Sequence, residues 1–348
     1  MIIMEKQATK QQIDFVIAEV KKMGIKADVI HGAFRTVIGL VGDESKVPFD
    51  RLAILPGVME TKMVERPYKL ISREYNKPFE AEGKVRGINV GNVKIGGGSP
   101  VYIAGPCAVE SKKQIFRIAK EVKEAGAHIL RGGIFKPRSS VHSFQGLGSS
   151  GDEEARQALS WLKEAGDMYG MPVMTEVRGE KQVDMIAEYV DILQVGSRNM
   201  YDQDLLGAIA LKNKPVLYKR HFGASIEEFL SFAEYIAAAG NKDILLCERG
   251  IVPVGKGKNF TRYNLDIAAV PVIHKETFLP VIVDPSHAAG RRELIKSMSL
   301  AAIAAGAEGL MIEVHYNPKE ALVDASQMIT PVELKNIIEI GDKISKLV

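Results

Sequence analysis

Apolar residues in this chain recur in short runs that alternate with longer stretches of helical spacing. From Val101 onward, eight apolar runs of strand length begin near Val101, His128, Pro172, Asp191, Pro215, Asp243, Pro280 and Gly309. Helical spacing follows each run, over 112–125, 152–169, 180–188, 202–211, 225–239, 264–275, 291–305 and 331–347. Eight strand–helix repeats over about 250 residues predict a (β/α)8 barrel of the TIM type. The alternative is an open doubly wound sheet, which usually has fewer strands and a glycine-rich phosphate loop that this sequence lacks.

The first 68 residues follow a different pattern: strand, helix, strand, strand, helix, strand. Apolar residues recur at helical spacing within 9–23, and Gly24 ends that helix. Short β-rich runs over 27–31 and 35–41 precede a weakly helical stretch at 48–55 and a last strand at 58–64. This order predicts a small ferredoxin-like α+β domain over 1–68.

Between the two patterns, the polar stretch 69–84 is predicted to be a linker. Residues 85–98 have the apolar alternation of a β-hairpin, with Gly91-Asn92 at its turn. We expect this hairpin to close the bottom of the barrel. The predicted catalytic domain therefore runs over 85–348 and begins with the hairpin.

Composition excludes several classes of protein. The chain has 348 residues and a net charge of +3 from 46 basic and 43 acidic residues, which is too balanced for a general nucleic-acid binder. No apolar run approaches the roughly 18–20 residues that span a bilayer, and the first residues lack the order of a signal peptide, so a cytoplasmic location is expected. Two cysteines, Cys107 and Cys247, are too few for a disulfide framework, although a bond between them stays open.

Residues with metal-binding side chains fall at the ends of the predicted strands. Cys107 follows the first run, His287 follows the seventh, Glu313 ends the eighth, and Asp324 lies in the loop beyond it. Because a barrel of parallel strands gathers its strand ends on one face, these four side chains form a candidate metal site. A thiolate combined with an imidazole and carboxylates suits one divalent Mn, Fe, Co or Zn ion better than Mg or Ca.

Each of these four residues also has an ordinary structural explanation. Cys107 alone is typical of a small buried apolar side chain, and His287 alone of a structural histidine. Glu313 could pair with a cation, and Asp324 could cap a helix. The convergence of three strand ends and one loop on one face favours the metal site. Three other residues are expected to have supporting or core roles: Glu176, His315 and Cys247.

The same strand ends carry many basic side chains: Arg131, Lys136, Arg138, Arg198, Lys219, Arg220 and Arg249. Buried cations are costly unless they are paired, so a cluster of this kind predicts bound anions. Guanidinium groups bind phosphate and carboxylate through two hydrogen bonds, whereas lysine acts as a point charge. The rim of the barrel is therefore suited to two phosphates, or to a phosphate and a carboxylate.

Several segments together resemble the 3-deoxy-D-arabino-heptulosonate 7-phosphate (DAHP) synthase family, in its type I branch with a ferredoxin-like N-terminal extension. The segments are Gly105-Pro106-Cys107, Leu130-Arg131-Gly132-Gly133, Phe135-Lys136-Pro137-Arg138, Ser143-Phe144-Gln145-Gly146, Gln194-Val195-Gly196-Ser197-Arg198, Cys247-Glu248-Arg249-Gly250 and Asp284-Pro285-Ser286-His287. As a set they are highly specific, and they span most of residues 85–345. The resemblance implies a transferase that condenses phosphoenolpyruvate with erythrose 4-phosphate, the entry step of the shikimate pathway of aromatic amino acid biosynthesis.

The resemblance also implies roles for particular residues. It assigns the metal to Cys107, His287, Glu313 and Asp324, and erythrose 4-phosphate to Arg138 and Ser139. It assigns phosphoenolpyruvate to a set of five cations: Arg131, Lys136, Arg198, Lys219 and Arg249. Lys136 is the candidate proton donor to the new alkoxide, so that Lys136, Cys107 and His287 are the expected catalytic residues.

The sequence departs from the family pattern at two places. After Lys136-Pro137-Arg138 it has Ser139-Ser140-Val141-His142, where Thr-Ser or Thr-Thr and then Pro-Tyr are common. Both hydroxyl groups are kept, so little effect is expected. His221 stands where glycine usually follows Lys219-Arg220, which puts the backbone of that loop, and with it substrate affinity, in question.

Two other functions compete with this one. The sister enzyme that makes 3-deoxy-D-manno-octulosonate 8-phosphate shares the barrel but typically has Lys-Ala-Asn-Arg at 136–138 and no small N-terminal domain. A non-catalytic sensor of phosphorylated metabolites would not need all four metal positions. The N-terminal domain is expected to bind phenylalanine or tyrosine as an inhibitor, or alternatively to serve oligomerisation, and the family suggests a homotetramer.

Overall fold

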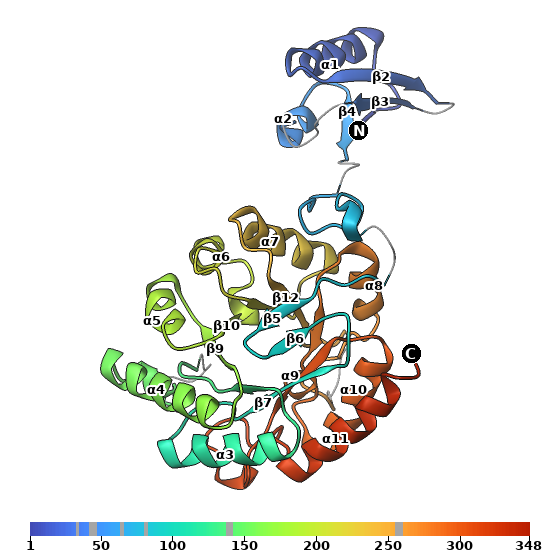
Figure 1. Cartoon of the computed structure of the whole chain (residues 1–348). Helices are drawn as coiled ribbons and strands as arrows, with labels where there is room; N and C mark the ends of the chain where they lie inside the picture. Colours follow the sequence, from blue (N-terminus) through green and yellow to red (C-terminus); the bar gives the residue numbers. More distant parts are fainter. Residues whose placement is uncertain (33–34, 42–46, 63–65, 80–82, 137–141, 255–259) are drawn as a thin grey trace. The chain divides into compact units, whose positions relative to one another are not determined.

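The computed structural model divides the chain into two compact units, Met1–Pro67 and Tyr68–Val348 (Figure 1). It describes residues 1–32, 35–41, 47–62, 66–79, 83–136, 142–254 and 260–348. Within the described residues, every helix is too short or too polar to cross a lipid bilayer.

The N-terminal unit has the ferredoxin-like order that the sequence predicts. Its strands are β1 (Ile2–Met4), β2 (Lys26–His31), β3 (Thr36–Val41) and β4 (Val58–Thr61), and its helices are α1 (Lys10–Lys22) and α2 (Phe49–Ala53). The sheet order is β2-β3-β1-β4, and the pairs of β1 with β3 and β4 are antiparallel. Thr9 begins α1 with a capping box to Gln12, and Gly24 (φ 76°) follows its end. Apolar side chains of α1, including Val16 and Val20, pack against Ile2, Met4 and Ile38 of the sheet.

All eight predicted barrel strands are present and they close on themselves. The strands are β7 (Val101–Gly105), β8 (Ile129–Arg131), β9 (Val173–Val177), β10 (Ile192–Val195), β11 (Val216–Lys219), β12 (Ile244–Glu248), β13 (Val281–Val283) and β14 (Gly309–Glu313). Every neighbouring pair is parallel, and β14 pairs with β7 over five residues to close the barrel. Closure excludes the open doubly wound sheet.

Helices surround the strands, as Figure 1 shows. They are α3 (Lys112–Glu124), α4 (Asp152–Met168), α5 (Val183–Ala187), α6 (Gln203–Ala210), α7 (Ile226–Ala238), α8 (Ala269–Glu276), α9 (Pro285–Ala289), α10 (Arg292–Ala304) and α11 (Pro331–Ile344). Two details differ from the sequence prediction. Helix α8 begins at Ala269 rather than at 264, and the short α9 was not predicted because five residues are too few to reveal helical spacing.

A β-hairpin closes one end of the barrel, as predicted. Strands β5 (Ile88–Val90) and β6 (Val93–Ile95) pair antiparallel, and their four apolar side chains are buried. These side chains pack with residues that lie mostly in the first half of each barrel strand, such as Val101, Ile129 and Ile192. Cys247 belongs to the same buried cluster, in agreement with the core role expected for it.

The stretch predicted as a linker packs on the barrel where the structure describes it. Ile71, within this stretch, and Tyr68, just before it, are buried in the core of the second unit. Arg73 is also buried and donates hydrogen bonds to the backbone oxygens of His274, Phe79, Lys84 and Thr277. The polar composition of 69–84 predicted a linker, whereas the polar side chain of Arg73 hydrogen-bonds this stretch to the barrel unit.

Candidate active site at the carboxyl ends of the barrel strands

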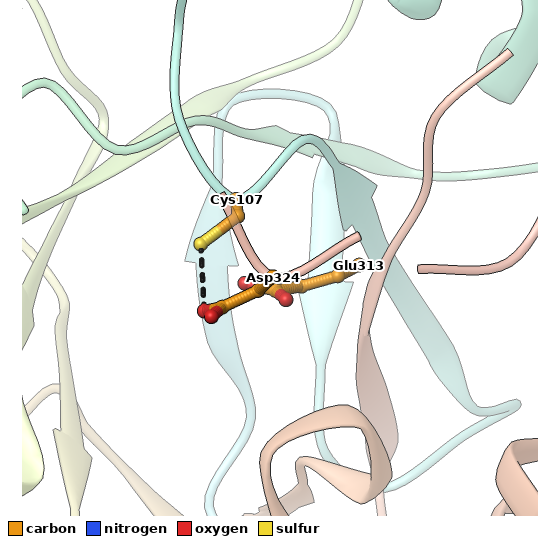
Figure 2. A group of neighbouring side chains, drawn as sticks. All are labelled: Cys107, Glu313 and Asp324. Carbon is orange, nitrogen blue, oxygen red and sulfur yellow. Dashed lines mark hydrogen bonds between the residues drawn. The ribbon is translucent and has the colours of Figure 1, made fainter. Parts of the chain in front are cut away.

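Three of the four predicted metal ligands meet at the carboxyl ends of β7 and β14. Cys107 lies two residues beyond β7, Glu313 is the last residue of β14, and Asp324 lies in the following loop. The ligand atoms of these residues, named here the thiol–acid cluster, all lie within 4.8 Å of one another. Figure 2 shows the thiol of Cys107 directed toward the carboxylate of Asp324, to which it donates a hydrogen bond of 3.2 Å. Asp324 has a left-handed backbone (φ 50°), which aspartate tolerates better than most residues.

The fourth residue, His287, lies at the edge of the thiol–acid cluster. Its Nε2 is 3.4 Å from Oε1 of Glu313. Its Nδ1 lies 2.7 Å from Oδ2 of Asp284, the N-cap of α9, which also accepts the backbone N–H of His287 at 3.0 Å. This double contact fixes the imidazole ring so that Nε2 faces the cluster. The prediction that all four side chains lie on one face of the barrel agrees with this geometry.

Burial and neighbouring charges shift the pKa values of Cys107 and Glu313 in opposite directions. Burial raises the pKa of the Cys107 thiol well above its ordinary value, and the carboxylate of Glu313 raises it further. Burial would also raise the pKa of Glu313, but His287 and Arg131 outweigh it and lower that pKa below its ordinary value. A thiol of this kind loses its proton readily only when a cation compensates the thiolate charge. The donor set and its buried, acidic surroundings therefore fit a divalent metal ion.

The predicted cations fall into two groups. In the first group, each basic side chain is already neutralised by a buried carboxylate. Arg131 donates to Oε1 of Glu313 at 2.6 Å, and Lys219 donates to Oδ2 of Asp284 at 2.6 Å. Arg131 therefore contacts the thiol–acid cluster, and Lys219 contacts Asp284, the residue that orients His287.

Arg220 also belongs to the neutralised group. Its Nη1 donates to Glu248 and to Asp266, each at 2.9 Å. Its Nε donates to the backbone oxygen of Ala224 at 3.0 Å. The expectation that Arg220 contributes to an anion site stays a prediction, and the two carboxylates beside its guanidinium do not favour it.

The second group retains its charge for a ligand. Within the described residues, Lys136, Arg198 and Arg249 form no ion pair with a carboxylate. Arg249 is 5% exposed, stacks its guanidinium 4.2 Å from the ring centre of Tyr263, and has a buried Nη1 without a hydrogen-bond partner. Burial lowers its pKa, which means that the charge is costly as it stands. Such an arginine favours an anion at this place.

One cavity joins these unneutralised cations to His287 and Asp324, two of the predicted metal ligands. Its lining includes Lys136, Glu176, Arg198, Lys219, Arg249, Arg262, His287 and Asp324. Gln194 donates to Glu176 at 2.9 Å and holds that carboxylate on the wall, which agrees with a supporting role. Burial would lower the pKa of Lys136, but the neighbouring Cys107 and Glu176 raise it. Arg138, Ser139 and the departure at Val141 lie outside the described residues.

The loop that contains His221 is ordered by local contacts. The Nδ1 of His221 accepts the backbone N–H of Gly223 at 3.1 Å, and the ring lies 4.1 Å from that of Phe222. Burial and the nearby Arg249 lower the pKa of His221, so the ring is neutral at neutral pH. His221, at the position where glycine is usual, thus stabilises the turn to Gly223 through its own side chain.

His315, expected to be a supporting residue, lies apart from the cavity. It is 1% exposed, and its Nδ1 accepts the backbone N–H of Asn317 at 3.0 Å. Its ring packs 4.3 Å from that of Tyr316.

Sequence reasoning missed two residues of the site. Arg262 lines the cavity from the loop after β12, thirteen positions beyond Arg249. Gln327 is buried and donates to Oε2 of Glu313 at 2.6 Å. Neither residue stands at a strand end, and the sequence pattern identified candidate site residues mainly at strand ends. The basic character of 256–262 was the one available signal for Arg262.

Two family models together match nearly the whole chain. The family model described as DAHP synthetase I family matches residues 74–348, and the model described as DAHP synthase ferredoxin-like domain matches residues 1–66. The phospho-2-dehydro-3-deoxyheptonate aldolase of Thermotoga maritima is 44% identical over 344 residues, which cover 99% of this chain and 97% of that protein. The 2-dehydro-3-deoxyphosphooctonate aldolase of Desulfosudis oleivorans is 31% identical over 264 residues, covering 71% of this chain and 90% of that protein.

Solved structures give the same result. The crystal structure of the Thermotoga maritima DAHP synthase superposes with a TM-score of 0.91 at 42% identity and covers 99% of this chain and 97% of that one. A truncated form of the Thermotoga maritima enzyme superposes with a TM-score of 0.70 at 42% identity and covers 81% of this chain and 97% of that one.

Proposed function

We propose, from the premise that this chain belongs to the DAHP synthetase I family, that the cavity at the carboxyl ends of its barrel strands is where the family reaction takes place. The reaction condenses phosphoenolpyruvate with erythrose 4-phosphate to give DAHP and inorganic phosphate, the first step of the shikimate pathway. The observation that supports this location best is a single cavity lined by unneutralised cations and by metal-ligand side chains.

The thiol–acid cluster and His287 would hold one divalent metal ion. The ligands are the sulfur of Cys107, Nε2 of His287 and carboxylate oxygens of Glu313 and Asp324. Sulfur and nitrogen among the donors favour Mn, Fe, Co or Zn over Mg or Ca. When bound, this ion supplies Lewis acidity to the aldehyde carbonyl of the sugar phosphate.

The unneutralised cations would bind phosphoenolpyruvate. Arg198 and Arg249 each offer a planar donor pair that matches a phosphate or a carboxylate, and Lys136 adds a point charge. Lys219 and Arg131 would contribute further positive charge, although each also pairs with a carboxylate. Because Lys136, Arg198, Lys219 and Arg249 line one cavity, their charges would offset the repulsion between the two anionic substrates.

The chemistry can then be followed through this chain's own residues. The enol carbon (C3) of phosphoenolpyruvate attacks the aldehyde carbon, and positive charge develops at C2, the carbon that bears the phosphate. Lys136 is protonated at neutral pH and would give its proton to the new alkoxide. Water adds at C2, and the tetrahedral intermediate expels phosphate by cleavage of the C–O bond. Glu176, which faces the same cavity, is the carboxylate placed to accept a proton from that water.

The two competing functions differ in what they predict. The octulosonate synthases are the more distant relatives among those compared, and they match less of the chain. A non-catalytic sensor would bind the same anions without turnover. One assay separates these possibilities: phosphate release from phosphoenolpyruvate with erythrose 4-phosphate, and in parallel with arabinose 5-phosphate. We expect release with erythrose 4-phosphate alone; release only with arabinose 5-phosphate, or with neither sugar, would refute this function.

We also propose that the N-terminal ferredoxin-like unit is regulatory and binds phenylalanine or tyrosine, and that the enzyme works as a homotetramer. The family relationship of residues 1–66 supports the first proposal. Titration of each aromatic amino acid against the full-length enzyme tests it, and unchanged activity throughout would contradict it. Sedimentation analysis tests the tetramer.

A further inference from the structure

Arg262 is a cation of the cavity that no strand-end pattern accounts for. It lies in the loop after β12, and its backbone N–H donates to the oxygen of Ala289 at 3.0 Å, at the end of the helix that carries His287. Its side chain lines the cavity together with Arg249, His287 and Asp324. The loop is therefore fastened to α9 in a position where the guanidinium reaches the site.

The charge of Arg262 is not neutralised by the protein. In the part of the chain that the structure describes, its hydrogen-bond partner is the amide oxygen of Gln327, 3.3 Å from Nη1, and it forms no ion pair with a carboxylate. An amide orients a guanidinium without cancelling its charge. Arg220 shows the opposite arrangement, since two carboxylates hold its Nη1. Arg262 therefore resembles Arg249 in keeping its charge for a ligand.

Gln327 places Arg262 on the metal side of the cavity. The Gln327 side chain is 2% exposed, and its Nε2 donates to Oε2 of Glu313 at 2.6 Å while its oxygen accepts from Arg262. Its backbone N–H donates to the oxygen of Asp324 at 3.1 Å. Two hydrogen bonds thus connect the guanidinium to a carboxylate of the thiol–acid cluster, and both ends of the amide are used.

We propose that Arg262 binds the phosphate group of erythrose 4-phosphate and that Gln327 positions it for this task. This inference rests on the proposed function. The aldehyde end of the sugar would lie beside the candidate metal ligands. Only three carbons separate the aldehyde carbon from the phosphate ester, so a cation that adjoins those ligands is within reach of the phosphate. Arg262 is exposed, adjoins the metal ligands and carries a guanidinium, whose geometry suits phosphate.

The test compares Arg262→Gln and Arg262→Lys with the unaltered enzyme in steady-state kinetics. We expect Arg262→Gln to lower kcat/KM for erythrose 4-phosphate by about 10- to 100-fold, the usual loss for one charge-assisted hydrogen-bonding group. The KM for phosphoenolpyruvate should stay within about threefold, because that anion binds to other cations. Arg262→Lys should recover part of the loss. Competitive inhibition by inorganic phosphate against erythrose 4-phosphate should weaken in parallel.

A matched control is Arg156→Gln, which removes an exposed arginine of α4 whose partner is Glu188 at 2.9 Å, and it should leave both substrates unaffected. Equal losses for both substrates in Arg262→Gln would show a merely structural role and overturn the proposal, as would no loss at all. If the unaltered enzyme releases no phosphate in the same assay, the proposed function itself fails, and the inference falls with it.

Discussion

The two ends of the barrel interior differ in the polarity of their side chains. At the amino-terminal end, the apolar side chains of the β5–β6 hairpin pack against apolar side chains of the barrel strands. At the carboxyl end, the interior is filled with buried Arg131, Lys219, Asp284 and Glu313, each 5% exposed or less. Burial of apolar side chains stabilises the fold but is not directional. Buried ion pairs orient the side chains that form them, at a cost in stability. The contrast separates the end that holds the fold together from the end where we propose the reaction takes place.

The largest predicted effect comes from Cys107→Ala. Loss of one ligand of the thiol–acid cluster should lower kcat by about 1,000-fold or more, because the Lewis acidity lost is worth several kcal/mol. The change is read from phosphate release, with the metal content of the purified variant measured in parallel.

Cys247→Ala is the matched control, since Cys247 lies in the apolar cluster of the barrel. It should keep full activity and lose about 1 kcal/mol of stability. Equal activity losses in the two variants would contradict the separation of the two ends.

A second prediction concerns the two kinds of arginine at the carboxyl end. Arg220→Gln should destabilise the fold by about 3–5 kcal/mol, because it leaves the buried carboxylate of Glu248 without its partner. Arg249→Gln should leave the melting temperature unchanged or slightly raised, since it removes a buried cation that has no carboxylate partner. It should instead lower kcat/KM for phosphoenolpyruvate by about 100-fold.

Thermal unfolding followed by circular dichroism, together with steady-state kinetics, distinguishes these outcomes. A lower melting temperature in Arg249→Gln than in Arg220→Gln would reverse the assignment of the two groups.

At the other end, Ile95→Ala removes a fully buried side chain from the hairpin. We expect a loss of about 2–5 kcal/mol in the free energy of unfolding and an unchanged KM for both substrates. Urea denaturation and kinetics on the folded fraction measure the two quantities. A changed KM would mean that the hairpin is coupled to the site.

A small effect on catalysis is predicted for removal of residues 1–67. The barrel unit Tyr68–Val348 has its own core, and a truncated form of the Thermotoga maritima enzyme superposes on 81% of this chain. The truncated enzyme should keep kcat within about threefold and lose any inhibition by phenylalanine or tyrosine. Inhibition of the truncated enzyme by phenylalanine or tyrosine would contradict the proposal, because the effector would then bind to the barrel unit.

The sequence predicted much of this molecule because its strands and helices follow simple periodicities. Runs such as those at Val101 and Gly309 are buried on both faces, so they read as continuous apolar segments. Cys107, His287, Glu313 and Asp324 could be found because strand ends converge in a barrel. The short α9 and the packed segment after Tyr68 could not be predicted, since both depend on tertiary contacts rather than on periodicity.

The pairing of charges was equally hidden from the sequence. Arg220 and Arg249 stand at neighbouring strand ends and look alike in sequence, yet one is neutralised by Glu248 and the other is not. Arg262 and Gln327 come from loops, where the sequence gives no rule for the direction of a side chain. Only three-dimensional contacts reveal which cations are available to a ligand.

The central claim is that the thiol–acid cluster and His287 form the metal centre of a DAHP synthase. The most direct measurement titrates chelator-treated enzyme with Mn²⁺ and follows both bound metal and phosphate release from phosphoenolpyruvate and erythrose 4-phosphate. We predict that activity rises in proportion to occupancy of one site per chain, and that Cys107→Ala shows neither the site nor the activity. Full activity in the chelated enzyme, or unchanged metal binding in Cys107→Ala, would contradict the account.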